Sequence, residues 1–257
     1  MVKEVKERYF LSAEPEKKAT ARDIPRRRET LCAAILLFCG RILWAGDIAA
    51  YVDLGFSADG AIYMFAQYGV QAGTLKPWAD LFVVDVVQNN FAGGGKVSFV
   101  HDAPVIAGQD GSGALYRLIA RNAALAERYG VSYLLQGQAL YMALDDGNRT
   151  SPVGEIIEFR DFKTNGYYRA QLVPRIEGSG SALASSFYIT LERTAWDGAR
   201  KTYMVGNPQI RRPLISSYRI RKVMVAPRDG SVVFVIEMRK LGADGMDIRY
   251  MVEALRL

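Results

Sequence analysis

The chain has 257 residues, of which 50% are hydrophobic and 23% charged. This is the composition of a folded globular protein, and it excludes a disordered or collagen-like chain. The net charge is +6, but residues 1–45 hold 10 basic and 6 acidic side chains, so the rest of the chain carries only +2. Because this charge is small and no RNA-binding motif or basic helix accompanies it, we expect no nucleic-acid partner.

The first feature in chain order is an export signal. A basic segment, Arg26-Arg-Arg-Glu-Thr30, precedes the apolar run 31–40, and Ala45 supplies a small residue before Gly46. We therefore predict an N-terminal extension and a cleavable Sec-type signal peptide over residues 1–45, cleaved near Ala45. A buried core helix or an uncleaved amphipathic anchor are the alternatives.

The same signal predicts a periplasmic or secreted location. The apolar run is shorter than the ~20 residues that a transmembrane helix needs, so we do not expect an integral membrane protein. Cys32 and Cys39 are the only cysteines, and both lie in the segment to be removed. The mature protein would then lack disulfides, thiol catalysis and thiolate metal sites.

The body begins with a predicted β-hairpin. Two apolar segments, 51–56 and 61–66, flank a turn that ends in Asp59-Gly60, and glycine accepts the positive φ that such a turn requires. A further strand is predicted over residues 79–87. Turn signals recur along the rest of the body, which is typical of an all-β domain.

One segment, 112–129, has helical instead of β periodicity. Leu115, Leu118, Ile119 and Ala126 recur at helical spacing, and Gly130 is suited to end the helix. We predict one amphipathic helix that lies on a sheet.

The apolar segments and turn signals in the middle of the chain predict an antiparallel meander. No linker separates it from its neighbours, so we expect a single β-rich domain over residues 46–257. Its strands are predicted at residues 138–144, 154–160, 167–173, 186–193 and 201–205.

An internal repeat joins the two ends of the body. Residues 54–65 align without a gap with residues 224–235, so that the turn Asp59-Gly60 falls on Asp229-Gly230. Each copy continues into a loop and an apolar strand with an acidic residue, Asp85 or Glu253. We predict two β-meanders, at about 49–88 and 217–256, whose structural turn residues are Asp59, Gly60, Asp229 and Gly230.

These meanders resemble the Ser-Pro-Asp-Gly repeats of periplasmic TolB-like β-propellers. Only two copies are present, whereas a propeller needs at least four blades. The body also resembles a bacterial family of predicted secreted proteins without an assigned function. This resemblance implies export but does not indicate any particular activity. The residues that carry this second resemblance are Leu54-Gly-Phe-Ser57, Tyr68-Gly69, Val84-Asp85, Ser186-Phe-Tyr-Ile189 and Arg249-Tyr-Met-Val-Glu253.

Catalytic motifs are scarce. His101 is the only histidine, and the adjacent Asp102 is poorly placed to orient its ring in a catalytic triad. Gly93-Gly-Gly95-Lys96 lacks the spacing of a phosphate loop, and Asp244-Gly-Met-Asp247 lacks that of an EF-hand. The carboxylates near loops that remain for a glycosidase are Asp102, Asp110, Asp145, Asp146 and Glu155.

Two groups of side chains offer binding surfaces. A basic stretch, Arg211-Arg212 with Arg219, Arg221 and Lys222, suits anionic glycan or lipid head groups, although a solvated strand face explains it as well. Four aromatic residues suit a sugar or protein surface, or else the core of a sheet. They are Trp78, Tyr167, Tyr168 and Trp196.

We conclude that the sequence predicts a mainly β fold of antiparallel meanders, propeller-like or sandwich-like, with one helix. The function predicted is that of a non-catalytic periplasmic or secreted binding or scaffold module, with an envelope protein or glycan as partner. A carboxylate-dependent cell-wall glycan hydrolase is the alternative. No catalytic, cofactor-binding or metal-binding residues are assigned.

Overall fold

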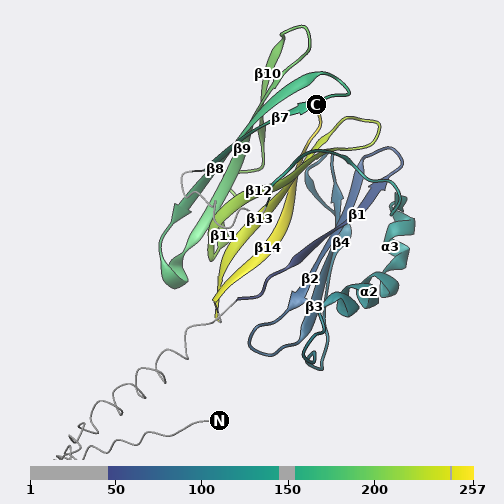
Figure 1. Ribbon diagram of the computed structural model, residues 1–257, viewed down its shortest axis with the longest axis vertical. Helices are drawn as coiled ribbons and strands as arrows, with labels where there is room; N and C mark the ends of the chain where they lie inside the picture. The colour runs from purple at the N-terminus through teal and green to yellow at the C-terminus, as the bar shows by residue number, and fades with distance from the viewer. Residues whose placement is uncertain (1–45, 145–153, 244) are drawn as a thin grey trace, which may run out of the picture. The chain divides into compact units, whose positions relative to one another are not determined.

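A computed structural model describes residues 46–144, 154–243 and 245–257. The predicted signal peptide, both cysteines and the pair Asp145 and Asp146 lie outside these residues. Within them, antiparallel strands form three sheets, and two helices cover one of these sheets (Figure 1). The mainly β, antiparallel fold predicted from the sequence is confirmed.

The helix-covered sheet has the strand order β4-β3-β2-β1-β5. Its strands are β1 (Ala50–Ser57), β2 (Ile62–Val70), β3 (Pro77–Asp85), β4 (Asn90–Val100) and β5 (Val131–Ser132). The helices that cover it are α2 (Ser112–Arg121) and α3 (Ala123–Arg128).

The central sheet has the order β14-β13-β12-β6, and the outer sheet has the order β10-β9-β8-β7, with β11 paired to β9. The central strands are β6 (Gln138–Met142), β12 (Ile215–Val225), β13 (Val232–Gly242) and β14 (Gly245–Leu255). The outer strands are β7 (Glu155–Asp161), β8 (Gly166–Glu177), β9 (Ala184–Thr194), β10 (Arg200–Val205) and β11 (Arg212–Pro213), and a 3₁₀ turn spans Gly180–Ala182.

The central sheet is buried on both faces. Along β13, Phe234 and Ile236 pack in a core with the outer sheet, whereas Val233 and Val235 pack in a core with the helix-covered sheet. Because successive side chains of a strand point to opposite faces, one apolar run supplies both cores. Sheets packed face to face in this way are sandwich-like.

The predicted helix covers the far face of the helix-covered sheet. Leu115 and Leu118 of α2 share a core with Met64 of β2 and Leu81 of β3. The prediction of one continuous helix is corrected, because the segment divides at Asn122 into α2 and α3. The Asn122 side-chain amide donates to a backbone carbonyl of α2, a local bond that competes with continuous helix.

Strand β4 was missed by the sequence analysis. In its pairing with β3, Phe82 is opposite Lys96 and Val84 is opposite Phe91, so one residue of β3 faces several residues of β4. The three glycines 93–95 lie in this β-bulge. A Cβ added to Gly95 would lie 2.6 Å from the carbonyl oxygen of Val83. Gly95 therefore permits the close approach of β4 to β3.

The two turns that align in sequence have similar hydrogen bonds. In the β1–β2 turn, the Asp59 carboxylate accepts the backbone N–H of Ala61 at 3.1 Å. In the β12–β13 turn, the Asp229 carboxylate accepts the backbone N–H of Ser231 at 2.9 Å. The glycine that follows each aspartate has a positive φ, which a residue without a Cβ adopts readily.

Residues 47–49 run along the edge of the central sheet. The Ala49 N–H donates to the carbonyl of Ile248 at 3.2 Å, and the Ile248 N–H donates to the carbonyl of Asp47 at 2.8 Å. The first described residues are thereby attached to β14. Among the described residues, no helix has the length and apolar character to cross a membrane.

Candidate functional site

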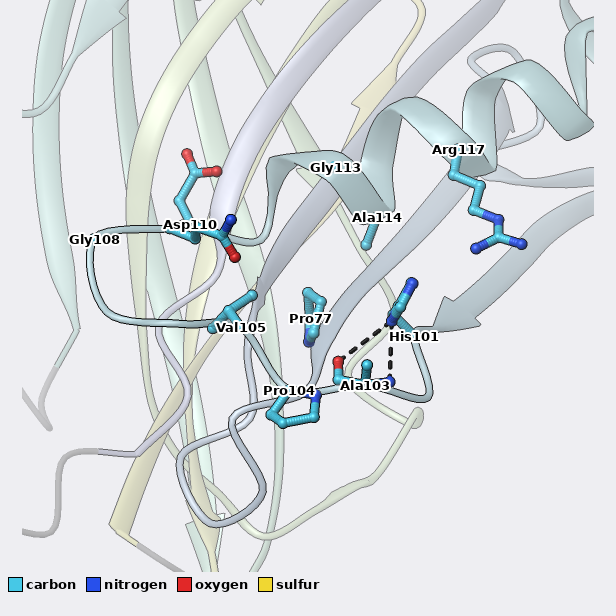
Figure 2. A pocket seen from close by; sticks show the side chains of 11 residues that line it. Pro77, His101, Ala103, Pro104, Val105, Gly108, Asp110, Gly113, Ala114 and Arg117 are labelled. Carbon is cyan, nitrogen blue, oxygen red and sulfur yellow. Dashed lines mark hydrogen bonds between the residues drawn. The ribbon is translucent and has the colours of Figure 1, made fainter.

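A cavity of about 700 Å³ lies at one end of the helix-covered sheet (Figure 2). Three parts of the chain line it: Pro77 at the start of β3, the loop 101–111 that follows β4, and the first turns of α2. This volume lies within the usual range of small-molecule sites.

Backbone contacts hold the loop in place. The N–H of His101 donates to the carbonyl of Pro77, and the N–H of Val105 donates to the carbonyl of Leu75, each at 2.8 Å. At the other end of the loop, a Cβ added to Gly111 would lie 2.3 Å from the carbonyl oxygen of Gly69. The loop is thus attached to the sheet at both ends and forms one wall of the cavity.

His101 is oriented by its own loop. Its Nδ1 lies 3.0 Å from the backbone nitrogen of Ala103, whose N–H it can accept, and 3.3 Å from the carbonyl oxygen of the same residue, so the loop fixes the orientation of the ring. Figure 2 shows Nε2 on the side of the ring that faces away from Ala103 and toward Arg117. The ring also meets Phe99 edge-on, with 6.3 Å between the ring centroids.

Arg117 projects from α2 beside the cavity. Its guanidinium lies 5.3 Å from the centroid of the Phe99 ring, and the guanidinium of Arg121, one turn later, lies 5.2 Å from the same centroid. No carboxylate forms an ion pair with Arg117 within the described ranges. A stacked guanidinium in this state keeps its hydrogen-bond donors available for a planar anion.

Asp110 brings a negative charge to the rim. The hydroxyl of Ser112 donates to its carboxylate at 2.6 Å, and the backbone N–H of Ser112 donates at 3.0 Å. These hydrogen bonds lower the pKa of Asp110 below its ordinary value, because they stabilise the ionised form. The carboxylate is therefore fixed at the start of α2.

The carboxylates considered for glycosidase chemistry are dispersed. Asp102 and Asp110 lie in the loop beside the cavity, whereas Glu155 lies in β7 of the outer sheet. Glu155 accepts the backbone N–H of Ile220 at 2.8 Å, which ties it to the central sheet. In the part of the chain that the structure describes, no group of three or more His, Cys, Asp or Glu side chains is placed to hold a metal ion.

The basic stretch forms ion pairs. Arg212 lies 3.3 Å from Glu253, Arg221 lies 3.4 Å from Glu237, and Lys222 of β12 lies 2.8 Å from Asp53 of β1. Arg211 pairs with the exposed Glu177. Since these charges stabilise contacts within and between the sheets, the stretch does not offer a continuous basic surface.

The four aromatic residues separate into two classes. Trp78 and Tyr168 are buried core residues, whereas Tyr167 and Trp196 are exposed on the outer sheet and its turn. The exposed Phe162 was not singled out by the sequence analysis.

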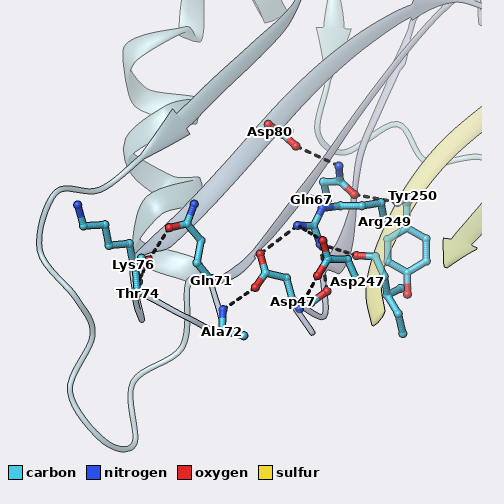
Figure 3. Close-up of polar contacts among 11 residues, drawn as sticks. Asp47, Gln67, Gln71, Ala72, Thr74, Lys76, Asp80, Asp247, Arg249 and Tyr250 are labelled. Atoms are coloured by element: carbon cyan, nitrogen blue, oxygen red, sulfur yellow. Dashed lines mark hydrogen bonds and ion pairs between the residues drawn. The ribbon is translucent and has the colours of Figure 1, made fainter. Parts of the chain in front are cut away.

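A second polar cluster joins the start of the described chain to its last strand (Figure 3). The Arg249 guanidinium lies 3.0 Å from the Asp47 carboxylate, 3.6 Å from that of Asp247 and 4.3 Å from the centroid of the Trp78 ring. Asp47 also accepts the backbone N–H of Ala72 at 2.5 Å. Because its charges are already paired, we interpret this cluster as a structural clamp.

Comparisons with known proteins give one family. A family model described as "Predicted secreted protein (DUF2259)" matches residues 64–256, which include the cavity, both helices and all the described strands except β1 and the first two residues of β2. No curated protein and no solved structure gives a significant match.

Proposed function

The chain belongs to this family of predicted secreted proteins, whose function is unassigned, and from this membership we propose that it acts after export as a non-catalytic binding module. We assign the binding role to the cavity beside His101 and Arg117. Its ligand is a small molecule that carries one carboxylate group.

The observation that carries this proposal is the Arg117 guanidinium beside the cavity, without a carboxylate partner within the described ranges. Arg117 offers the bidentate hydrogen bonds that carboxylates accept, and the Nε2 atom of His101, when it carries a proton, offers a further donor on the same side. Pro77, Val105 and Ala114 supply apolar contacts for the remainder of the ligand. The fixed charge of Asp110 disfavours ligands that carry several negative charges.

We propose that residues 1–45 contain the signal peptide for export. It would be cleaved near Ala45, and the protein would reach the periplasm or the extracellular space. The family description supports secretion, and the contacts of Asp47 and Ala49 with β14 show that the residues just after the proposed cleavage point belong to the fold. Mass spectrometry of the N-terminal peptide from the exported protein should find Gly46 as the first residue. An intact N-terminus in the cytosol would contradict this.

We further propose that β1–β3 and β12–β14 are two copies of one folding unit of the TolB-like kind. Their turns support this, because each uses an aspartate carboxylate and a glycine of positive φ in the same way. A chain in which residues 57–60 and 227–230 exchange places should retain the unfolding midpoint within a few degrees. A chain that fails to fold would contradict it.

The binding proposal is tested by calorimetric titration with two sugars of the same ring type. N-acetylmuramic acid carries a carboxylate, and N-acetylglucosamine lacks it. We expect only the first to bind, and we expect Arg117→Gln to remove that binding. Arg128→Gln is the matched control, since Arg128 is also an exposed arginine stacked on an aromatic ring but does not line the cavity.

Equal binding of both sugars, or binding that survives Arg117→Gln, would contradict the assignment of the site. If neither sugar binds, titration with lactate and with the common amino acids extends the test, and absence of binding there too would overturn it. Turnover of peptidoglycan fragments that disappears in Asp110→Asn would favour the glycan hydrolase instead.

A further inference from the structure

Two turns meet at one end of the outer sheet. The β7–β8 turn spans residues 162–165, and the β9–β10 turn spans residues 195–199. Tyr167 of β8 is opposite Arg160 of β7 on one side and Thr194 of β9 on the other, and Thr194 is opposite Arg200 of β10. Both turns therefore lie at the same end of the sheet, as Figure 1 shows at its upper edge. We call this end the hairpin tip.

Each turn exposes one large aromatic side chain. Phe162 is 79% exposed and Trp196 is 81% exposed, and Tyr167 at the base of the tip is 42% exposed. By contrast, Trp78 and Tyr168 are almost completely buried in the same molecule. Exposed aromatic residues at the ends of adjacent loops are unfavourable in water and mark a surface that meets another apolar phase or partner.

Basic side chains surround these rings. Arg160, Lys163, Arg200 and Lys201 are all exposed at the tip, and the Arg160 guanidinium lies 5.6 Å from the centroid of the Phe162 ring.

The acidic side chains of the tip are fewer. Asp161 is buried, and its carboxylate accepts the Thr164 hydroxyl at 2.6 Å. Asp197 is exposed, and its carboxylate accepts the N–H of Ala199 within the turn at 2.9 Å. One row further from the tip, Glu158 and Glu192 lie within 4 Å of Arg169. Four exposed basic groups against two carboxylates leave the tip positively charged.

We propose that the hairpin tip docks on the surface of a membrane that contains anionic lipids. Trp196 and Phe162 enter the interfacial layer, where aromatic rings are stable, and the four basic side chains meet the lipid head groups. The apolar Phe162 ring favours a lipid surface over a glycan, because it has no hydrogen-bonding group for sugar hydroxyls. This docking surface is separate from the cavity and independent of its ligand.

The test uses the fluorescence of Trp196 as a local probe. In the full chain with Trp44→Phe, the two remaining tryptophans are the exposed Trp196 and the buried Trp78. Vesicles of phosphatidylcholine with phosphatidylglycerol should shift the emission to the blue and protect it from acrylamide. Phosphatidylcholine vesicles should produce neither change, and high salt should reverse both.

Variants locate the effect at the tip. Lys163→Glu with Lys201→Glu should weaken the vesicle response about tenfold or more, because each basic group near the surface adds to the attraction. Lys96→Glu with Arg175→Glu is the control: it changes the net charge equally at exposed positions of β4 and the far end of β8. This control should leave the response unchanged.

If anionic vesicles leave the Trp196 emission unshifted and as accessible to acrylamide as before, the proposal is wrong, whatever binding other parts of the chain show. So would an equal response to neutral vesicles, or a response to a soluble anionic polysaccharide such as polygalacturonate without a response to vesicles. This readout on the unmodified tip does not depend on the folding of the charge variants.

Discussion

Gly60 lies against the backbone of Pro227: a Cβ added to Gly60 would lie 2.2 Å from the Pro227 carbonyl oxygen. The two turns that align in the sequence are therefore in contact, one in the helix-covered sheet and the other in the central sheet. Gly60 has a φ of +80° and Gly230 a φ of +75°, but a Cβ on Gly230 would meet nothing within 4 Å. Two glycines with the same backbone conformation thus differ in the space around them.

This difference predicts unequal stability losses. Gly230→Ala should cost about 1 kcal/mol, which is the cost of placing a Cβ in the left-handed region. Gly60→Ala should cost at least ~2 kcal/mol more, since the Cβ also collides with backbone that must shift. Urea unfolding of both variants measures the difference. Equal losses would show that the contact between the turns does not affect stability.

Glu253 predicts a pH-dependent stability. Burial raises its pKa above the ordinary value, although the amide of Asn89 and the charge of Arg212 oppose this. The folded state therefore holds this proton more tightly than the unfolded state does. The resulting stabilisation is fully present below the unfolded pKa, near 4.5, and is lost as the pH rises through the folded pKa.

Glu253→Gln removes this titration. The unfolding free energy of the wild type, relative to that of the variant, should therefore fall as the pH rises above about 4.5, the ordinary value for a glutamate. Glu158→Gln serves as a control on the exposed face of the outer sheet, where an ion pair with Arg169 at 3.7 Å contributes less than about 1 kcal/mol. If the difference in unfolding free energy between the wild type and Glu253→Gln stays constant as the pH rises, the prediction is wrong.

The clamp around Asp47 predicts that its removal lowers the stability of the fold. Asp47→Ala removes a hydrogen bond from Ala72 and an ion pair with Arg249, and should lower the unfolding free energy by about 1–3 kcal/mol. Asp197→Ala, in an exposed turn with a single backbone hydrogen bond, should cost less than about 1 kcal/mol. Thermal unfolding of both proteins provides the comparison. Equal stability of the two variants would rule out a clamp at Asp47.

Local patterns in the sequence predicted most of the elements. The Asp-Gly turns mark the β1–β2 and β12–β13 hairpins because aspartate and glycine satisfy the turn backbone without any distant contact. Leu115 and Leu118 predict a helix in the same way, through their spacing alone. Strand β4 was missed because its three glycines, 93–95, interrupt the alternation by which a strand is identified.

The candidate site was only partly accessible to such reasoning. His101 attracted attention as the only histidine of the sequence, whereas no sequence pattern singled out Arg117. Their position on either side of one cavity depends on the loop 101–111, which returns the chain to the sheet through contacts with Pro77, Leu75 and Gly69. Nothing in the spacing of His101 and Arg117 reveals that return.

The sequence by itself determined the mainly β class, the Asp-Gly hairpins and the helical segment, because each depends on side-chain periodicity or on local backbone geometry. Only the tertiary structure decided that the last three strands lie between the other two sheets, and that the middle of the chain forms the outer one. The physical reason is that apolar burial is non-directional: a sequence pattern states which face is covered, and the packing of distant segments decides what covers it.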